Sequence, residues 1–536
     1  MKLDPDAPGA PVAVAEPSER ARPSLDQRSW WRPVFAWSIA GMLLVALVLR
    51  FVTKSDLWLD EALSVNISRL PLKDLHQALK QDGAPPLYYL LLHGWISVFG
   101  TSDLAVRSMS GVIGVLTLPA AWFCGRRMAG DDEGQRAWLP WATVLVVGFS
   151  PYAIRYSTEA RMYGLEILLV LLGYLALRGA LDGPRPTNLV GLALVTGLLL
   201  YTQYWALYLV VVVAAALVYW AWRGDNIRNA RLTLGALVVG CITWVPWIPT
   251  FLYQAKHTGT PWGRPVAPPT GLAFTFLDFA GSDRTEGWLL VLPLLLLAFL
   301  AVFGRARDRN RIELDVRTVP GVRWEALVGF VTLLVGLTAS FAARSAFQSR
   351  YAAIMFGLFA LVVAYGTLTF SRYMLRVAAI LVVVALGFAG GVRNVVENRT
   401  QAFQSADLIK ARSHRGDVVL YCPDQVGPDV SRLLPASLGL AQWTFPGFHA
   451  PDRINWIDYA KRNDAASVAA FARQALARAG SHDIWYVYST GYRTYGTKCE
   501  DLITELAGSR TPERLVAPDD INYFEYMGLV HFAARP

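Results

Sequence analysis

The sequence predicts a polytopic α-helical membrane protein with a small C-terminal α/β domain, and three observations support this prediction. Hydrophobic residues make up 54% of the 536 residues and charged residues only 17%, a balance that is unusual for a purely soluble protein. The apolar residues form repeated blocks of about 17 to 22 residues, the length that a helix needs to cross a bilayer core of about 30 Å. The long polar region 397–536 instead holds short apolar runs of strand length.

The first 32 residues are rich in proline, alanine and charge, so we expect a disordered cytosolic tail over 1–32. The first apolar block, about Pro33 to Phe51, is not closed by a small-residue cleavage site and is expected to be an anchor rather than a removed signal peptide. Ten later blocks bring the count to about eleven transmembrane helices within a membrane domain, 33–396, and place the two chain ends on opposite faces. These blocks are about 104–123, 137–152, 162–180, 188–204, 206–222, 232–250, 287–304, 325–342, 352–370 and 377–394.

The apolar block Pro85–Phe99 is ambiguous, because its 15 residues make a helix of only about 22 Å and begin with two prolines. We expect it to lie along the interface, inside a long first external loop, 52–103. The positive-inside rule supports this choice, since it leaves 21 lysines and arginines in the tail and the short cytosolic loops and 7 in the short outer loops. Membrane orientation thus accounts for most of the net charge of +9, and no nucleic-acid partner is expected.

The polar C-terminal region is expected to be a soluble extracytoplasmic α/β domain. Asp417–Cys422 and Asp483–Tyr488 are typical of buried strands, and the alanine-rich Asp464–Ala479 is typical of a helix between them. Outside the cytosol Cys422 and Cys499 can form a disulfide; the alternative is two separate free thiols.

Two adjacent carboxylates, Asp60 and Glu61, follow the first span directly after Trp58. Tryptophan suits a membrane interface, and the carboxylates would begin the next helix, where the helix dipole favours negative charge. Two interpretations stay open: Asp60 is simply a helix N-cap, or the pair is catalytic.

A second group of charges lies at the outer junction of two spans. Arg155 and Glu159 are four residues apart and Glu166 lies seven further on, so the three share one face if the helix begins early. Glu166 falls inside an apolar span, where an ionisable group is costly and marks a site or a buried pair. The alternative is an intrahelical ion pair that only locks the loop.

Arg344 and Arg350 lie in an outer loop, against the positive-inside bias, just before Tyr351 and the next span. Because the guanidinium fork binds phosphate well, we expect a phosphate-bearing lipid headgroup; general attraction to anionic lipid is the alternative. Other polar residues on this face are expected to line a cavity, and His93 and His257 could hold a metal with Asp82. No fixed ligand spacing supports such a site, so we assign no metal ligands and expect no required cofactor, leaving a divalent metal open. The cavity candidates of this kind are Asp82, His93, Gln203, Tyr204, His257, Asp278 and Asp283.

Read in order, LWLDEA (57–62), DGAPPLYYLLLHGW (82–95), SDLAVR (102–107) and the late SRY (349–351) resemble the membrane glycosyltransferases of the GT-C superfamily. The most similar pattern is glycosyltransferase family 39, the protein O-mannosyltransferase and lipid A aminoarabinose transferase group, over about residues 35–370. The resemblance implies a GT-C fold with helices lying on the membrane in the first external loop, a catalytic Asp there, and a sugar donor on a polyprenyl phosphate. The alanine- and arginine-rich chain and its soluble tail also resemble actinobacterial envelope enzymes, which implies decaprenyl phosphate as the carrier.

Carried onto this chain, the resemblance makes Asp60 the catalytic base with Glu61 beside it, and Arg350 the ligand of the donor phosphate. Arg155, Arg161 and Arg344 are weaker candidates for that phosphate. Two departures matter: Gln203 stands where relatives often have the His of Thr-His-Tyr, and Ala84 replaces the His of the His-Pro-Pro found in protein O-mannosyltransferases, so a protein acceptor does not follow. The expected substrate cavity comprises Asp82, Tyr88, His93, Glu159, Tyr163, Glu166, Gln203, Tyr204, His257 and Tyr351.

The implied activity is inverting transfer of a sugar from a polyprenyl-phosphate donor to an acceptor hydroxyl on the outer face of the cell membrane. Decaprenyl-phosphate mannose is the first expectation for the donor and arabinose the second; the acceptor is an envelope glycan, a glycolipid or a protein. The phosphate-binding loop patterns G-x-x-x-x-G-K-[ST] and G-x-G-x-x-G do not occur in a suitable setting, which disfavours a nucleotide-sugar donor. The alternatives are a transporter or flippase of a lipid-linked envelope precursor, in which Glu166 and the outer arginines serve translocation, and a non-catalytic scaffold that binds an envelope polymer.

Overall fold

The computed structural model describes residues 31–534 apart from 225, 261–262, 283 and 309–310. The predicted tail, 1–32, therefore lies almost wholly outside the described residues. The chain divides into one compact unit that ends at Val45 and a second that runs from Ala46 to the C-terminus. Helix α1 (Trp31–Val48) passes from the first unit into the second, and its apolar sequence matches the predicted first span.

Within the second unit, the membrane part is a helix bundle. In the described residues, eight helices are long and apolar enough to cross a membrane, and a ninth span results if α6 and α7, bent by 61° at their junction, count as one. Together with the shorter apolar helices α1 and α9, they account for all eleven predicted spans. The helices that follow the first loop are α5 (Asp103–Met128), α6 (Glu133–Gly148), α7 (Pro151–Ser157), α8 (Tyr163–Asp182), α9 (Pro186–Thr202), α10 (Ala206–Arg223), α11 (Ile227–Ile242), α12 (Ile248–His257), α13 (Pro268–Phe279), α14 (Thr285–Phe303), α15 (Arg323–Ala342), α16 (Ala353–Gly366) and α17 (Tyr373–Val396).

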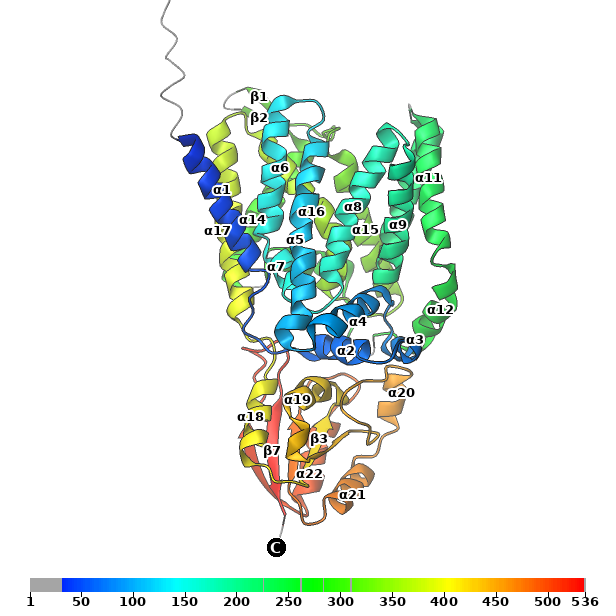
Figure 1. Ribbon diagram of the computed structural model, residues 1–536, viewed down its shortest axis with the longest axis vertical. Coiled ribbons are helices and arrows are strands. Elements are labelled where there is room, and N and C mark those ends of the chain that lie inside the picture. The colour runs from blue at the N-terminus through cyan, green and yellow to red at the C-terminus, as the bar shows by residue number, and fades with distance from the viewer. Residues whose placement is uncertain (1–30, 225, 261–262, 283, 309–310, 535–536) are drawn as a thin grey trace, which may run out of the picture. The chain divides into compact units, whose positions relative to one another are not determined.

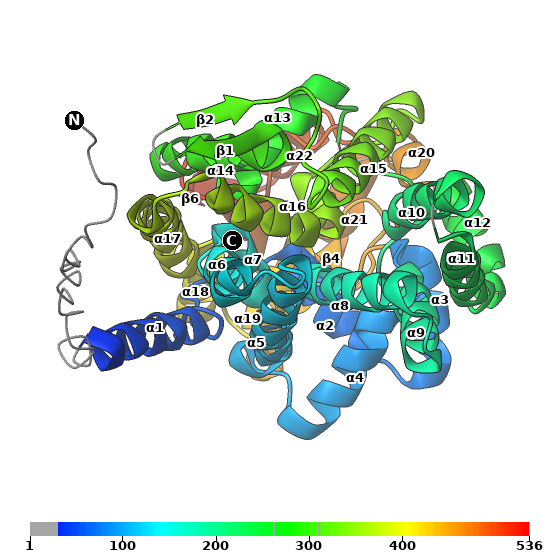
Figure 2. The same cartoon turned by 90° about the horizontal axis from the view of Figure 1, so that it is seen from above.

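The span that contains α16 is the most deeply buried, with 89% of its most apolar window inside the protein. Seen end-on, α16 lies among α6, α8, α14 and α15 (Figure 2). Its sequence is apolar on every side, as a helix surrounded by other helices requires. The loop between α14 and α15 forms a short hairpin, β1 (Gly304–Asp308) and β2 (Arg311–Leu314), which the sequence did not predict.

Three short helices lie across one end of the bundle, between it and the C-terminal domain (Figure 1). They are α2 (Leu59–Ser68), α3 (Leu72–Asp82) and α4 (Leu87–Phe99). Helix α4 is the ambiguous apolar block, and its 13 residues run along the bundle end rather than through the bundle. This arrangement agrees with the interfacial position that its short length predicts.

The C-terminal domain contains a five-stranded sheet of strand order β4-β3-β5-β7-β6. Strands β3, β4 and β5 are parallel, whereas β7 runs antiparallel to both β5 and β6. The predicted strands and helix are present as β3, β5 and α21, although α21 begins only after the N-cap Ser467. The elements are α18 (Ala402–Arg412), β3 (Val418–Cys422), α19 (Gly427–Leu433), β4 (Ala441–Thr444), α20 (Tyr459–Asp464), α21 (Val468–Ala479), β5 (Ile484–Tyr488), α22 (Lys498–Ala507), β6 (Thr511–Val516) and β7 (Gly528–Ala533).

Both faces of this sheet are covered, which explains why β3 and β5 are fully buried apolar runs. Alternate residues of β3 point to opposite cores: Leu420 packs on the α21–α22 side and Val419 on the α18–α19 side. The disulfide Cys422–Cys499 joins the end of β3 to α22, so the sequence's first alternative for these cysteines is the one the structure contains.

Candidate functional site

The site is built around the start of α2, the helix that carries both sequence-predicted carboxylates. Trp58 occupies the N-cap position, and no residue of α2 caps the helix with its own side chain. Asp60 is therefore not the N-cap, which removes the structural alternative for this residue. Its side chain is 18% exposed, and its Oδ2 lies 3.4 Å from Nη2 of Arg350 and 3.9 Å from Nη2 of Arg161. The carboxylate of Asp60 thus faces two guanidinium groups from separate parts of the chain.

Glu61 points the other way and is fully buried. Its Oε1 accepts hydrogen bonds from Nε of Arg107 at 2.7 Å and from the backbone N–H of Ala160 at 2.8 Å, and its Oε2 accepts one from Nη2 of Arg107 at 2.5 Å. Burial alone raises the pKa of Glu61, but the charge and hydrogen bonds of Arg107 outweigh it and lower the pKa overall. The carboxylate of Glu61 is saturated by protein donors, so this residue ties α2 to α5 and to the loop between α7 and α8.

Arg350 lies at the entrance to the α16 span and reaches the same point. Its guanidinium group covers the ring of Trp58, 5.3 Å from the ring centroid, and its buried Nε has no hydrogen-bond partner. The next residue back, Ser349, donates a hydrogen bond of 2.8 Å to Asp278 at the end of α13. Burial raises the pKa of Asp278. Among the described residues, Arg350 therefore keeps one buried N–H donor that no other group uses.

Arg155 and Glu159 form the predicted ion pair, with Nε of Arg155 2.8 Å from Oε2 of Glu159. The prediction that Glu166 shares their helix face is wrong, because α7 ends at Ser157 and a break precedes α8. Glu166 lies in the first turn of α8, fully buried, and neither carboxylate oxygen has a hydrogen-bond partner. Glu159 also keeps one oxygen without a partner and lies 3.8 Å from Nη1 of Arg399.

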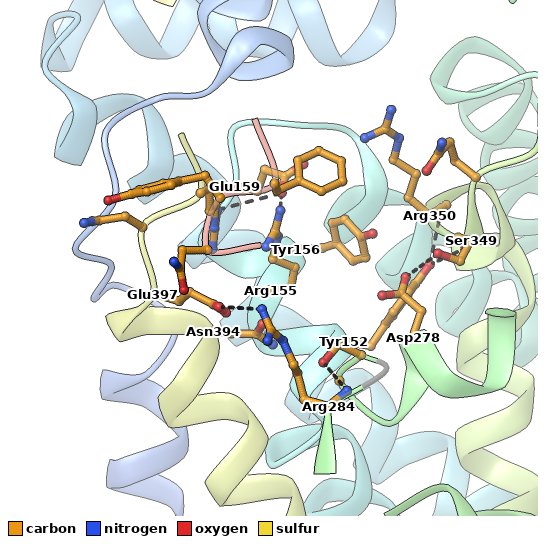
Figure 3. Close-up of a pocket in the computed structure, with 18 of the residues that line it drawn as sticks. Tyr152, Arg155, Tyr156, Glu159, Asp278, Arg284, Ser349, Arg350, Asn394 and Glu397 are labelled. Carbon is orange, nitrogen blue, oxygen red and sulfur yellow. Dashed lines mark hydrogen bonds and ion pairs between the residues drawn. The ribbon is translucent and has the colours of Figure 1, made fainter. Parts of the chain in front are cut away.

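Arg155, Glu159, Asp278 and Arg350 border a cavity of about 610 Å³ between the bundle end and the C-terminal domain (Figure 3). Asp60 is not among the described residues that line it, and it reaches the cavity through its ion pair with Arg350. Arg155, Arg284 and Arg350 project toward it from three different segments, and each has a carboxylate nearby. The carbonyl oxygens of Ser349 and Arg350 accept from the hydroxyl of Tyr152 at 3.3 Å, which fixes this wall. Mixed charges, amides and hydroxyls suit a polar, anionic or hydroxyl-rich ligand. The cavity is lined by Tyr152, Arg155, Tyr156, Glu159, Asp278, Gly281, Ser282, Arg284, Gln348, Ser349, Arg350, Asn394, Glu397, Asn398, Arg399, Asp520, Ile521, Asn522, Tyr523 and Phe524.

A second network joins Asp60 to α3 and α4 through Arg161. Nη1 of Arg161 donates to Ser64 Oγ at 3.2 Å and to the Tyr89 hydroxyl at 3.3 Å, and that hydroxyl donates to Asp82 at 2.9 Å. Burial raises the pKa of Asp82, against the opposing effects of Arg161 and Tyr89. Asp82 and Arg161 are thus brought close to Asp60, as the sequence predicts.

Of the residues predicted to form the substrate cavity, Glu159 is in the lining of the large cavity as the described residues show it, whereas Asp82, Tyr88, Tyr163, Glu166 and Tyr351 are not. Tyr163 packs against Tyr156, with ring centroids 4.9 Å apart, and Tyr351 packs against Trp205 at 5.9 Å. The Tyr88 hydroxyl bonds Ser110 at 3.0 Å and is fully enclosed.

Five further candidates do not line the large cavity, because their polar atoms point elsewhere. Arg344 is exposed, Gln203 accepts from the backbone N–H of Trp205, and Tyr204 bonds Gln254 and Trp247. Nδ1 of His93 lies 2.8 Å from the carbonyl oxygen of Ser68, and Nδ1 of His257 lies 3.3 Å from Asp458.

His93, His257 and Asp82 consequently do not form the metal site that was left open. Throughout the described part of the chain, His, Cys, Asp and Glu side chains form no group of three that could hold a metal ion. Asp283 lies outside the described residues.

Several lining residues were not predicted from the sequence: Arg284, Asn394, Glu397, Arg399 and the segment 520–524. Arg284 and Arg399, like Arg350, are positive charges on the predicted outer side of the membrane. This departure from the positive-inside bias would have been enough to predict them as site residues. Segment 520–524 has no such signal, because its position depends on how the C-terminal domain folds against α2.

Comparisons with known proteins agree with this arrangement. A family model described as dolichyl-phosphate-mannose-protein mannosyltransferase matches residues 83–249, less than half of the chain. No curated protein matches at a significant level.

Among solved structures, the chain is similar to ArnT from Cupriavidus metallidurans in the apo state, with a TM-score of 0.56, 14% identity, and coverage of 94% of this chain and 97% of that one. For the same protein bound to undecaprenyl phosphate the TM-score is 0.54 at 13% identity, covering 94% and 98%. The oligosaccharyltransferase of Archaeoglobus fulgidus is a more distant match, with a TM-score of 0.47, 10% identity, and coverage of 95% and 75%. The chain has the GT-C fold, and its resemblance to the membrane glycosyltransferases of the GT-C superfamily is confirmed.

Proposed function

We propose that the protein is a glycosyltransferase that moves a sugar from a polyprenyl phosphate to an acceptor hydroxyl, with Asp60 as the general base. The observation that carries this proposal is the different use of two adjacent carboxylates. Glu61 is buried and saturated by Arg107 and Ala160, whereas Asp60 is partly exposed and faces Arg350 and Arg161. A carboxylate beside two guanidinium groups provides a base for the acceptor proton and positive charge for the phosphate, which are the two groups that the reaction needs.

The chemistry is a single displacement with inversion. The acceptor oxygen attacks the anomeric carbon as the bond from that carbon to the lipid phosphate breaks; the phosphate leaves with the bonding pair, and the acceptor proton passes to Asp60. A positioned base typically contributes about 10² to 10⁴ in rate. Arg350, with its unused buried N–H, stabilises the negative charge that develops on the phosphate.

A cavity lined by Arg350, whose guanidinium group lies 3.4 Å from Asp60, supports a sugar substrate. Its volume of about 610 Å³ and its amide and hydroxyl side chains, among them Asn394, Asn398 and Ser282, suit a hydroxyl-rich ligand. The similar structure with bound undecaprenyl phosphate supports a lipid-phosphate donor. We propose decaprenyl-phosphate mannose first and decaprenyl-phosphate arabinose second, with an envelope glycan, a glycolipid or a protein as the acceptor.

The proposed setting is a multi-pass protein of the cell membrane with a cytosolic amino terminus. The positive-inside distribution supports an orientation in which the bundle end that carries α2 and the C-terminal domain, and hence the active site, lies outside the cytosol. This orientation agrees with a lipid-linked donor, because nucleotide sugars are supplied in the cytosol.

The test uses the purified wild-type protein in lipid nanodiscs with a panel of labelled polyprenyl-phosphate sugars. Acceptor- or water-dependent loss of sugar from one lipid is expected, with the product in the inverted anomeric configuration. Absence of both turnover and binding across the panel would contradict the proposal.

One observation favours a second candidate, a flippase of a lipid-linked precursor. Glu166 is buried in a membrane helix with neither carboxylate oxygen paired, an arrangement that occurs in translocation pathways. If the wild type moves a labelled lipid-linked sugar across the bilayer without releasing the sugar, this second function replaces the first.

A further inference from the structure

The C-terminal domain supplies the cap that α2 lacks. The backbone N–H of Leu59, the residue before Asp60, points at the carboxyl group of Glu525 and lies 3.2 Å from each of its two oxygens. Glu525 comes from the end of the C-terminal domain, 466 residues away. The first N–H groups of a helix have no partner within it, so a carboxyl oxygen at that position satisfies one of them.

Glu525 is itself held firmly. Its backbone N–H donates to the carbonyl oxygen of Arg399 at 2.9 Å, and its carbonyl oxygen accepts from the N–H of Gln401 at 2.9 Å. Its side chain is buried beside the carboxyl group of Asp429, which accepts a hydrogen bond of 3.2 Å from the Thr400 hydroxyl, and burial together with Asp429 raises the pKa of Glu525. The carboxyl group therefore has a fixed position relative to both the sheet domain and α2.

The segment that pairs with Glu525 reaches the other wall of the site. Arg399 donates to the carbonyl oxygen of Thr158 at 2.9 Å and to its hydroxyl at 2.7 Å, next to Glu159. The ring of Phe524 meets the ring of Trp58 edge-on, with centroids 5.2 Å apart, and the opposite partner of Trp58 is the guanidinium group of Arg350. Two paired segments of the C-terminal region, one at Arg399 and one at Phe524–Glu525, thus contact both sides of the site.

We propose that Glu525 is a positioning residue for the transfer reaction, and that the C-terminal domain forms part of the catalytic site by fixing α2 so that Asp60 faces Arg350. The proposal rests on the proposed function for its kinetic consequence, but the positioning itself is measurable without turnover. Loss of the cap frees the first turn of α2, and a displacement of about 1 Å of a catalytic group can cost about 100-fold in rate.

The experiment compares Glu525→Ala with Glu525→Gln in the full-length protein in nanodiscs. Glutamine keeps an oxygen for the N–H of Leu59 and can still bond Asp429, so it should rescue what alanine loses. Glu513→Ala is the matched control, because Glu513 lies on an exposed strand of the same domain and pairs with Arg412, away from α2. Two quantities are measured: amide hydrogen exchange of the peptide 57–65, and kcat and KM for donor and acceptor.

For Glu525→Ala we expect exchange of the peptide 57–65 to accelerate by about 2- to 30-fold, the range that follows from loss of a typical cap. We also expect kcat to fall by about 10- to 100-fold with both KM values little changed. Glu525→Gln and Glu513→Ala should match the wild type in both measurements.

Unchanged exchange in Glu525→Ala would overturn the positioning role, and so would a kcat loss shared equally by Glu513→Ala. A rise in KM alone would also overturn it, because that pattern belongs to a residue that contacts substrate. A wild-type protein that does not turn over any donor would refute the proposed function instead, and the exchange data would still decide the position of α2.

Discussion

Replacing Glu61 by glutamine tests whether Glu61 stabilises the fold, while its neighbour Asp60 carries out the chemistry. The substitution keeps the size of the side chain but removes the carboxylate that pairs with Arg107, whose side chain is 6% exposed. It also turns one acceptor into a donor, and this donor faces the Arg107 guanidinium group in either orientation of the amide, because both oxygens of Glu61 accept from Arg107.

The magnitude follows from burial. Removing one partner of a buried ion pair typically costs about 3 to 5 kcal/mol, because the other charge remains buried without compensation. Glu61 is fully enclosed and accepts three hydrogen bonds, so we expect the loss to fall within that range. Since the folded-state pKa of Glu61 is lowered, the pair's contribution is present above the usual pKa of 4.5 and is lost as the pH falls through the lower folded-state value.

The assay is thermal unfolding of the purified variants in one detergent. The fraction of protein that remains monodisperse after heating is measured at each temperature. Glu61→Gln should unfold at a markedly lower temperature than the wild type. The double replacement Glu61→Leu with Arg107→Met should recover much of the loss, because an apolar pair of similar volume leaves no buried charge. A Glu61→Gln protein as stable as the wild type but unable to transfer sugar would refute this reasoning and give Glu61 a chemical role.

Three further predictions concern other parts of the site and the C-terminal domain. Arg350→Ala should raise the donor KM by about 10- to 100-fold, the value of a charge-assisted hydrogen bond, while Arg350→Lys keeps part of the affinity; titration of donor binding measures both. Replacing Cys422 and Cys499 together by serine should lower the free energy of unfolding of the C-terminal domain by about 2 to 5 kcal/mol, since the bond closes a loop with a sequence separation of 77, and faster proteolysis of this domain would report the loss. Burial raises the pKa of Asp424 to about 6, so the folded state binds the extra proton and stability should fall as the pH rises from about 4 to about 6; Asp424→Asn should remove this part of the slope in pH-dependent unfolding.

Segment length and apolarity were enough to predict the membrane architecture. Each predicted span coincides with a helix, because a bilayer imposes a minimum length that a sequence displays directly. The 15 residues of Pro85–Phe99 were too short to cross, and the structure places their helix across the bundle end. Strands β3 and β5 were also predictable, since they are fully buried and uniformly apolar.

Other elements could not be predicted because their sequences are polar. Strand β6 is mostly exposed and carries Glu513 and Arg514, so it has no apolar run to mark it. The common face expected for Arg155, Glu159 and Glu166 assumed one continuous helix, but the chain breaks after Ser157. A local pattern of four- and seven-residue spacings carries no information about such a break.

Within the site, the sequence predicted which residues matter more readily than what each one does. Asp60, Arg161 and Arg350 converge as expected, although they are far apart in the chain. Glu61 differs from Asp60 because its carboxylate accepts hydrogen bonds from Arg107 and Ala160. These partners are distant in the sequence, and the folded chain brings them to Glu61. The role of Glu525 could not be predicted for the same reason, because its contact with Leu59 joins residues 466 positions apart in the chain.

The most direct test of the central claim compares sugar transfer by purified wild type, Asp60→Asn and Asp74→Asn on the donor that the wild type accepts. Asp74 is an exposed aspartate in the first turn of α3, so its replacement controls for loss of a charge in the same layer of the protein. The account predicts normal folding for all three, turnover by wild type and Asp74→Asn, and a loss of about 10² to 10⁴ in kcat for Asp60→Asn. Turnover by Asp60→Asn at the wild-type rate would contradict the assignment of Asp60 as the base.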